Sequence, residues 1–473
     1  MLLRRLFDEK LAQASYLVAC EHTNVALIVD PNRNIDQYLE AAARDNVRII
    51  GVTETHIHAD YVSGSRELAR RAGAQLYLSG EGGNEWQYDF AKASGATLLC
   101  DGMHITIGDV RVEVCHTPGH TPEHLTFLLT DTAVGNEPMG ALTGDFIFVG
   151  DVGRPDLLER AAGFKGTMEA GARVLFKSLG EFKKRPDYLQ IWPGHGAGSA
   201  CGKALGAMPQ STLGYERLFN WALLIDDEHE FVLEVLSGQP EPPAYFAIMK
   251  QVNRKGPADS PTTVPAKLGV EDIRRAIGSD SVVVDARPVN DFAEAHVRGT
   301  FNIPQNKSFL NWAGALVPYD RDVYFIGDAS DEGRRLLAQD LALIGLEKIA
   351  GVFPSESLRD LIESDTDSLS TATTSVATVA ANRIPTILDV RKRSEYSEGH
   401  IPGAVNIPLS ELPQRLAEIP EGSVVVHCQG GTRSAIAASI LQMNGRNEVS
   451  NMAGGFSEWE RGGNKVERGS AEG

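Results

Sequence analysis

Histidine and aspartate side chains that could bind a metal ion follow the ends of four predicted strands. The first group lies in Thr55-His56-Ile57-His58-Ala59-Asp60-Tyr61, after the apolar stretch 47–52. The others are His120 in Pro118-Gly119-His120-Thr121, Asp145 in Gly144-Asp145 and His195 in Pro193-Gly194-His195. Sites in α/β sheets gather at the carboxyl ends of strands, so we expect these side chains to converge. Two imidazoles and one carboxylate suit an Fe(II) oxygenase or a catalytic zinc, and residue types do not separate the two.

A second candidate for chemistry is the thiol in His427-Cys428-Gln429-Gly430-Gly431-Thr432-Arg433-Ser434. This run follows the apolar strand pattern 424–426 and precedes a helical pattern at 434–443. A cysteine at a strand-to-helix turn faces backbone N–H groups, which can hold an anion. The helix dipole and Arg433 favour the thiolate, which is the nucleophilic form. The same donors would hold a persulfide, Cys–S–S⁻.

The composition is that of an ordinary globular chain. Its 473 residues, 42% hydrophobic and 23% charged, leave room for about three domains. The 45 basic and 63 acidic residues give a net charge of −18, which argues against a nucleic-acid or anionic-membrane surface. Five widely spaced cysteines without a CxxC pair favour a reducing compartment, so we expect a cytoplasmic protein. We expect neither a signal peptide nor a transmembrane helix.

Two stretches rich in turn-forming residues, 255–265 and 364–381, read as linkers. We therefore predict domains at 1–254, 264–363 and 376–466. The second and third are repeats, because Asp285, Arg287, His296, Gly299, Asn302 and Pro304 recur with an offset of 104 as Asp389, Arg391, His400, Gly403, Asn406 and Pro408. Alternating strand and helix patterns predict a parallel α/β sheet in each repeat. We expect His296 and His400 to be structural.

The motifs HxHxD, PGHT, TGD and PGHG, in this order, resemble those of the metallo-β-lactamase superfamily. The resemblance covers the first domain and implies an αββα sandwich. Dinuclear hydrolases of this fold, such as glyoxalase II, have HxHxDH, but Tyr61 stands where their last histidine would be. A phenol is a poor metal ligand at neutral pH, so a second metal site loses a ligand.

Persulfide dioxygenases, which are members of this superfamily with one iron, resemble the chain more. They share Gly-Arg-x-Asp after the aspartate ligand, here Gly153-Arg154-Pro155-Asp156. The resemblance implies one Fe(II) per chain, held by His56, His120 and Asp145. It leaves His58, Asp60 and His195 beside the ligands, where they can orient them by hydrogen bonds. Arg154 lies beside the ligands or the substrate, unless it forms an ion pair with Asp156 or Asp151.

The third domain is similar to the rhodaneses (sulfurtransferases), through Cys428-x-x-Gly431-x-Arg433 followed by Ser434 and through the repeated pattern above. The resemblance implies that Cys428 and Arg433 are catalytic. In the middle repeat, the position of Cys428 is taken by Asp328 and that of Arg433 by Gly333. Without a thiol this repeat cannot carry sulfur, so we expect an inactive rhodanese-like domain.

Together the resemblances imply an α/β multidomain enzyme that oxidises low-molecular-weight persulfides with O₂ to sulfite and thiol. Cys428 would transfer sulfane sulfur to form or use thiosulfate, as in sulfide detoxification. Cys201, six residues after His195, is a possible sulfur relay or a small loop residue. One alternative is a zinc thioester hydrolase of the glyoxalase II type fused to a rhodanese; another is a sulfur carrier or sensor that uses only Cys428. We expect a homo-oligomer without nucleic-acid or membrane partners.

Overall fold

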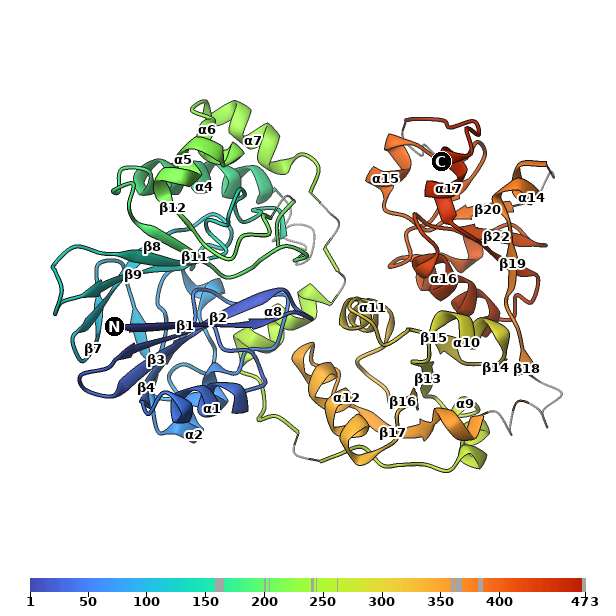
Figure 1. The fold of residues 1–473 in the computed structure, drawn as a ribbon, viewed down its shortest axis with the longest axis horizontal. Helices are drawn as coiled ribbons and strands as arrows, with labels where there is room; N and C mark the ends of the chain where they lie inside the picture. Colours follow the sequence, from blue (N-terminus) through green and yellow to red (C-terminus); the bar gives the residue numbers. More distant parts are fainter. Residues whose placement is uncertain are drawn as a thin grey trace. The chain divides into compact units, whose positions relative to one another are not determined.

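The computed structural model describes residues 1–157, 166–199, 201–203, 205–239, 242–243, 245–261, 263–358, 362, 368–381 and 386–469. The chain divides into two compact units (Figure 1). The first consists of Met1–Pro261 with the segment Ala342–Gly345, and the second of Thr262–Leu341 and Leu346–Gly473. Within the described residues, no helix combines the length and apolar character needed to cross a bilayer.

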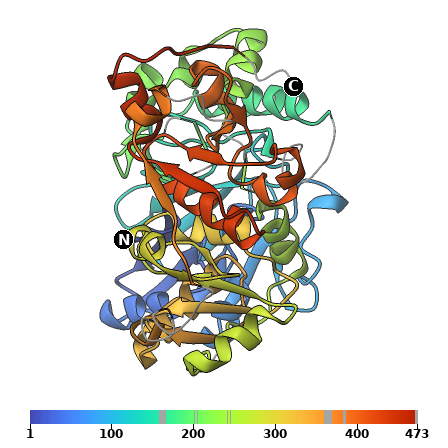
Figure 2. The ribbon, with the colours of Figure 1, turned by 90° about the vertical axis from the view of Figure 1, so that its right-hand side faces the viewer.

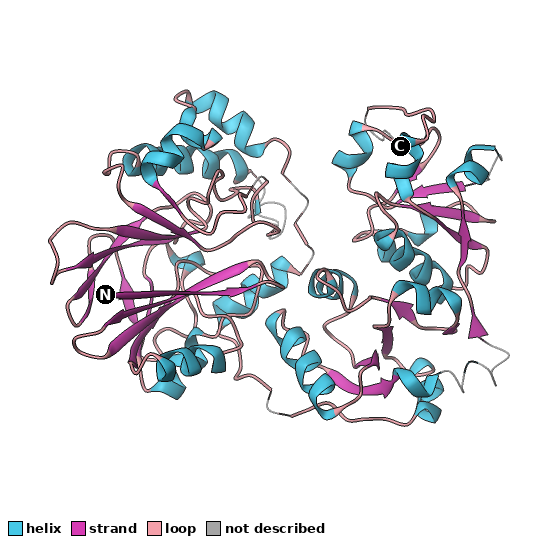
Figure 3. Ribbon diagram, viewed as in Figure 1, coloured by secondary structure: helices cyan, strands magenta, loops and turns pink. Residues whose placement is uncertain are grey.

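Two six-stranded sheets form the centre of the first unit, and helices cover their outer faces (Figure 3). One sheet has the order β1-β2-β3-β4-β5-β6, with β1 Leu2–Asp8, β2 Gln13–Cys20, β3 Val25–Val29, β4 Arg48–Thr53, β5 Gln75–Ser79 and β6 Thr97–Leu99. The other has the order β12-β11-β10-β9-β8-β7, with β7 His104–Ile107, β8 Val110–His116, β9 Leu125–Asp131, β10 Gly140–Gly144, β11 Gln190–Pro193 and β12 Ser211–Thr212. This is the αββα sandwich expected from the sequence.

The helices of the first unit pack on both sides of this sandwich. They are α1 Asp36–Arg44, α2 Ser65–Ala72, α4 Met168–Phe182, α5 Leu213–Phe219, α6 Trp221–Leu224, α7 Glu228–Leu236 and α8 Phe246–Lys255, with the 3-10 turn η1 Asn84–Trp86. All eight residues of β2 are buried, because alternate side chains point to opposite faces and both faces are covered. Tyr16 and Val18 pack between the sheets, whereas Leu17 and Ala19 pack in the core that contains Tyr38 of α1.

The second unit contains two parallel sheets. The first, β15-β13-β16-β17, is built from β13 Val282–Asp285, β15 Phe301–Asn302, β16 Val323–Gly327 and β17 Ile349–Pro354. The second, β19-β23-β22-β20-β21, is built from β19 Ala372–Thr374, β20 Thr386–Asp389, β21 Val405–Asn406, β22 Val424–His427 and β23 Val449–Met452 (Figure 2, orange to red). The four strands of the first sheet correspond in order to β21-β20-β22-β23 of the second, which has β19 as an additional strand. A short antiparallel pair joins β14 His296–Val297 to β18 Ser368–Leu369.

Helices connect the strands of both sheets. They are α9 Ile273–Ile277, α10 Val289–Glu294, α11 Phe309–Leu316, α12 Asp331–Leu343, α14 Val376–Ala381, α15 Arg393–Glu398, α16 Thr432–Met443 and α17 Gly455–Arg461. Five 3-10 turns occur in the described chain, four of them in this unit: η2 Val270–Asp272, η3 Ser355–Ser357, η4 Leu412–Gln414 and η5 Leu416–Glu418.

The sequence repeat corresponds to repeated contacts in space. Arg287 pairs with Asp285, and 104 residues later Arg391 pairs with Asp389. The ring of His296 stacks on Phe292 at 3.8 Å between centroids, and His400 stacks on Tyr396 at 3.7 Å. In each case His Nδ1 donates to the carbonyl of the aromatic residue. The two histidines are thus held by the same local contacts in both copies.

The prediction that residues 364–381 form a linker is wrong for the part of this stretch that the structure describes. Residues 364–367 lie outside the described residues, but 368–381 supply β18, β19 and α14. Strand β19 pairs in parallel with β23, and α14 buries Val376 and Val379. The Ser/Thr/Ala-rich composition gave no clear apolar pattern for these elements, because the buried face of the helix consists of only two valines.

Candidate metal centre and sulfur-transfer loop

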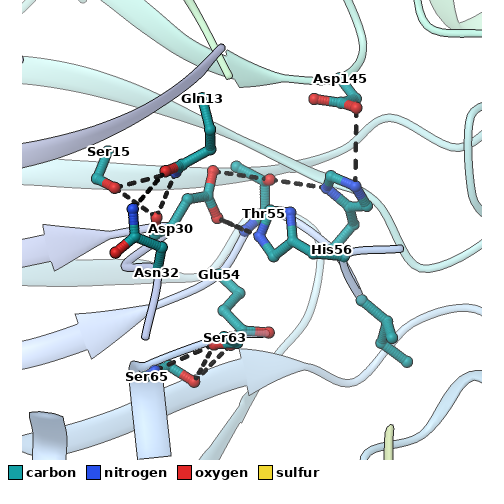
Figure 4. Close-up of polar contacts among 12 residues, drawn as sticks. Gln13, Ser15, Asp30, Asn32, Glu54, Thr55, His56, Ser63, Ser65 and Asp145 are labelled. Carbon is teal, nitrogen blue, oxygen red and sulfur yellow. Dashed lines mark hydrogen bonds and ion pairs between the residues drawn. The ribbon is translucent and has the colours of Figure 1, made fainter. Parts of the chain in front are cut away.

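Three of the predicted metal donors come together in the first unit. His56 follows β4, His120 follows β8 and Asp145 follows β10, and all three are buried. Asp145 Oδ2 lies 3.6 Å from His120 Nε2 and 4.0 Å from His56 Nε2, as Figure 4 shows for His56. One donor atom from each side chain lies within 4.8 Å of the others. The strand ends therefore deliver an N, N, O donor set to one point.

Hydrogen bonds orient both imidazoles for metal binding. Thr55 Oγ1 donates to Asp30 Oδ2 at 2.9 Å, so it can only accept from His56 Nδ1, 3.0 Å away. His120 Nδ1 donates to the carbonyl of Arg154 at 3.0 Å. Both rings thus carry their proton on Nδ1 and present the lone pair of Nε2 to Asp145. Burial lowers the pKa of His56 and of His120, which keeps both rings neutral.

The Asp145 carboxylate fits a metal ion. Its side chain is buried, and within the described chain neither of its oxygens has a hydrogen-bond partner. An ionised carboxylate without partners is costly to bury, and a divalent cation removes that cost. Two neutral imidazoles and one carboxylate form the 2-His-1-carboxylate set of non-haem Fe(II) sites, although such a set also accepts zinc.

His58, whose ring lies 4.3 Å from that of His56, makes its polar contact with Asp30. Its Nε2 lies 3.1 Å from Asp30 Oδ1, and its ring stacks on Tyr61. Burial alone would lower its pKa, but the charge and hydrogen bond of Asp30 raise the pKa of His58 to about 9. A protonated imidazole has no lone pair for a metal. Gln13, Ser15 and Asn32 complete the polar cluster around Asp30 (Figure 4).

Asp60 and His195 lie on the other side of Asp145, together with Cys201. His195 Nε2 is 3.3 Å from Asp60 Oδ2 and 3.5 Å from Asp145 Oδ1. Asp60, His195 and Cys201 also have donor atoms within 4.8 Å of one another. Burial, followed by the charges of Asp60 and Asp145, raises the pKa of Cys201 well above its ordinary value. This thiol is therefore protonated at neutral pH, which disfavours it as a sulfur nucleophile.

Arg154 forms the ion pair that the sequence analysis left open. Its Nε and Nη2 donate to the two oxygens of Asp156, both at 2.7 Å, and neither side chain is exposed. Its backbone carbonyl is the acceptor for His120 described above. The Arg154–Asp156 pair therefore fixes the backbone that orients a ligand. Gly153 approaches Asp145 so closely that a Cβ atom would lie 1.7 Å from the Asp145 carbonyl oxygen.

Sequence analysis missed His124, which the structure places behind the metal donors. Its Nε2 accepts the backbone N–H of Asp145 at 3.1 Å, and its Nδ1 lies 2.9 Å from Thr117 Oγ1. Burial lowers the pKa of His124 well below its ordinary value, which keeps the ring neutral and able to accept. The sequence signal for His124 was its position four residues after His120, but its partner, Asp145, is distant in sequence.

In the second unit, Cys428 lies between β22 and α16, as predicted. Its Sγ accepts the backbone N–H of Gly431 at 3.0 Å and lies 3.4 Å from Ser434 Oγ, whose hydroxyl is also 3.0 Å from the Gly431 carbonyl oxygen. These donors can stabilise a negative charge on sulfur. Cys428 is buried within its loop.

Arg433 faces a carboxylate. Its Nη1 and Nη2 donate to Glu395 Oε2 and Oε1 at 2.6 and 2.7 Å. Burial alone would raise the pKa of Glu395, but the hydrogen bonds and charge of Arg433 lower it, so Glu395 is ionised. In the middle repeat, Asp328 accepts from the backbone N of Ser330 at 2.9 Å, and this loop contains no thiol.

Comparison with known proteins finds a matching family in each of the two units. The Metallo-beta-lactamase superfamily matches residues 9–195, and the Rhodanese-like domain matches residues 375–461. A crystal structure of metallo-beta-lactamase from Staphylococcus aureus subsp. aureus COL is 41% identical, with a TM-score of 0.68, and the similarity covers 75% of this chain and 99% of that one.

Two curated proteins are each similar to part of the chain. Persulfide dioxygenase ETHE1 of Bos taurus is 27% identical over 280 residues, which is 57% of this chain and 88% of that protein. Protein YqhL of Bacillus subtilis (strain 168) is 46% identical over 81 residues, and the match covers 17% of this chain and 64% of YqhL. The αββα sandwich, its buried donor set and these similarities lead to one conclusion: the chain belongs to the metallo-beta-lactamase superfamily and carries a rhodanese domain in its C-terminal part.

Proposed function

We propose that this protein is a persulfide dioxygenase joined to a sulfurtransferase. The observation that carries the proposal is the donor set of His56, His120 and Asp145. Among the described residues the Asp145 carboxylate accepts no hydrogen bond, while Asp30 binds Nε2 of His58. This arrangement supports one Fe(II) per chain rather than two zinc ions. The similarity to ETHE1 supports a persulfide as the substrate.

The overall reaction of the first domain is R–S–SH + O₂ + H₂O → R–SH + SO₃²⁻ + 2 H⁺. Bound Fe(II) would supply the activation of O₂. The protein orients His56 through Thr55 and His120 through the Arg154 carbonyl, and it fixes the Asp145 backbone through His124. These contacts preorganise the site, because both imidazoles have a fixed orientation and are neutral and the backbone of Asp145 is held in place. Asp60 and His195 remain beside the site, where they can orient substrate or water.

In the third domain, Cys428 would act as nucleophile on the outer sulfur of a second persulfide. The bond between Sγ and this sulfur forms as the S–S bond of the donor breaks. The departing R–S⁻ takes up the persulfide proton, which leaves Cys428–S–S⁻. The lone pair of sulfite then attacks the outer sulfur, thiosulfate forms, and the electron pair of the broken bond returns to Sγ. Gly431 N–H and Ser434 Oγ stabilise the negative sulfur.

We propose domain limits of 1–254, 264–363 and 376–466, with the middle domain an inactive rhodanese-like copy. The repeated Asp–Arg pair and His–aromatic stack support a shared fold, and Asp328 replaces the thiol. A zinc thioester hydrolase remains the second candidate, because Asp60, His195 and Cys201 form another donor group beside Asp145.

Product analysis of a thiol variant tests the coupling of the two activities. With glutathione persulfide and O₂, the wild type should form thiosulfate, whereas Cys428→Ser should consume O₂ at the wild-type rate and accumulate sulfite. Cys100→Ser is the matched control, since Cys100 is an exposed cysteine outside both sites. Thiosulfate formed by Cys428→Ser at the wild-type rate would contradict the role of Cys428 and direct attention to Cys201.

A further inference from the structure

Both arginines closest to the Cys428 loop are paired with carboxylates. Arg433 makes the two-pronged contact with Glu395 described above. Arg391 donates from Nε and Nη2 to Asp389, packs over the Phe456 ring at 3.9 Å, and donates from Nη1 to Gln429 Oε1. The charge of each guanidinium is thus largely cancelled by its own partner. The groups that reach Cys428 Sγ are the uncharged donors of Gly431 and Ser434.

Helix α15 fixes the position of Glu395. Besides Arg433, its Oε2 accepts the backbone N–H of Lys392 at 3.0 Å, which closes a capping box at the start of the helix. A carboxylate held in this way cannot move aside without losing both the cap and the ion pair. An anion that approaches Arg433 therefore meets a fixed negative charge.

Comparison of the two repeats distinguishes the Glu395–Arg433 pair from the contacts that both repeats share. The Asp–Arg pair and the His–aromatic stack occur in both copies. At the positions of Glu395 and Arg433, the middle repeat has Asp291 and Gly333, so the pair is missing where the thiol is missing. The middle repeat thus forms its sheet without an Arg–Glu pair at these positions, and the pair occurs in the repeat that contains the thiol.

We propose that Glu395 determines which sulfur donor the rhodanese domain accepts. Because Glu395 occupies Arg433, the loop takes sulfur from persulfides, whose terminal sulfur carries one charge, and discriminates against the thiosulfate dianion as a donor. Thiosulfate that forms from sulfite and Cys428–S–S⁻ then binds weakly to the loop and is released. This inference rests on the proposed sulfurtransferase function, and the chemical steps are those written above.

The test measures donor preference in the full-length protein, with cyanide as the acceptor and thiocyanate as the product. Thiosulfate and glutathione persulfide are compared as donors for the wild type and Glu395→Gln. The freed guanidinium gains a charge-assisted contact with the dianion, so the KM for thiosulfate should fall about tenfold. The KM for glutathione persulfide should change less than about threefold, since the single charge on a persulfide sulfur gains less. Glu398→Gln, an exposed position on the same helix, is the matched control and should change neither.

Other outcomes are distinguishable. An unchanged ratio of the two KM values in Glu395→Gln, with both donors active, would overturn the inference and leave the sulfurtransferase proposal standing. A folded wild type that transfers sulfur from neither donor would overturn the proposed function itself. If Glu395→Gln fails to fold, Glu395→Asp is the second variant, because it introduces the shorter acid that the middle repeat has at this position, Asp291. It should lower the KM for thiosulfate in the same direction, and an unchanged ratio there would count equally against the inference.

Discussion

Two histidines that are two positions apart have different roles at the residue scale. His56 is neutral and turns Nε2 toward Asp145, whereas His58 turns Nε2 toward Asp30 and is protonated. Asp30 is the residue that divides them, because one oxygen binds His58 and the other accepts from Thr55, which orients His56. The HxH motif alone offers both rings as ligands, and in the structure Asp30 occupies Nε2 of one of them, His58.

Removal of each histidine separates these roles. We predict that His56→Ala loses bound metal, while His58→Ala retains one metal per chain with an affinity about tenfold lower, since only the orientation of a ligand suffers. Elemental analysis and competition with a chelator measure both quantities. Equal metal loss in the two variants would make His58 a ligand and contradict the assignment.

At the scale of elements, the turn after β10 depends on one glycine. Gly153 lies against the Asp145 carbonyl, which leaves no space for a Cβ atom. The Gly-Arg-x-Asp segment therefore does two things: Gly153 permits the close approach, and Arg154 supplies the carbonyl for His120.

We predict that Gly153→Ala displaces Asp145 and weakens metal binding at least about tenfold, because the clash involves backbone atoms. Gly180→Ala is the control, since no atom of the described residues outside the helix backbone lies within 4 Å of a Cβ there and Gly180 lies in the last turn of α4. Alanine in that turn should stabilise the protein by at most about 0.5 kcal/mol. Metal titration and thermal unfolding measure these effects, and wild-type metal affinity in Gly153→Ala would refute the argument.

Much of the element structure could be predicted from the sequence, and the reasons are physical. Apolar stretches at 47–52, 110–114 and 424–426 correspond to β4, β8 and β22, because buried strands need apolar side chains. Strand β19 and helix α14 could not be predicted, since their positions depend on β23 and on two buried valines. His124 and Glu395 were missed because each acts on a partner brought near only by the fold, Asp145 and Arg433.

The net charge acts at the scale of the whole molecule. With a charge of −18, the protein repels an anionic persulfide at long range. Salt screens this repulsion, so an increase in ionic strength from about 20 to about 200 mM should raise kcat/KM for glutathione persulfide roughly two- to threefold. Initial rates of O₂ uptake at low substrate concentration measure the effect, and kcat should stay constant. A fall in kcat/KM would show that cations near the site, rather than the overall charge, control substrate approach.

The most direct test of the central claim combines metal content with O₂ uptake on protein purified without oxygen. We predict about one iron per chain. We also predict the loss of one O₂ for each glutathione persulfide that is converted by Cys428→Ser, in which sulfur transfer is disabled. Two zinc ions per chain and no O₂ uptake would contradict the account and would favour thioester hydrolysis at Asp60, His195 and Cys201 together with Asp145.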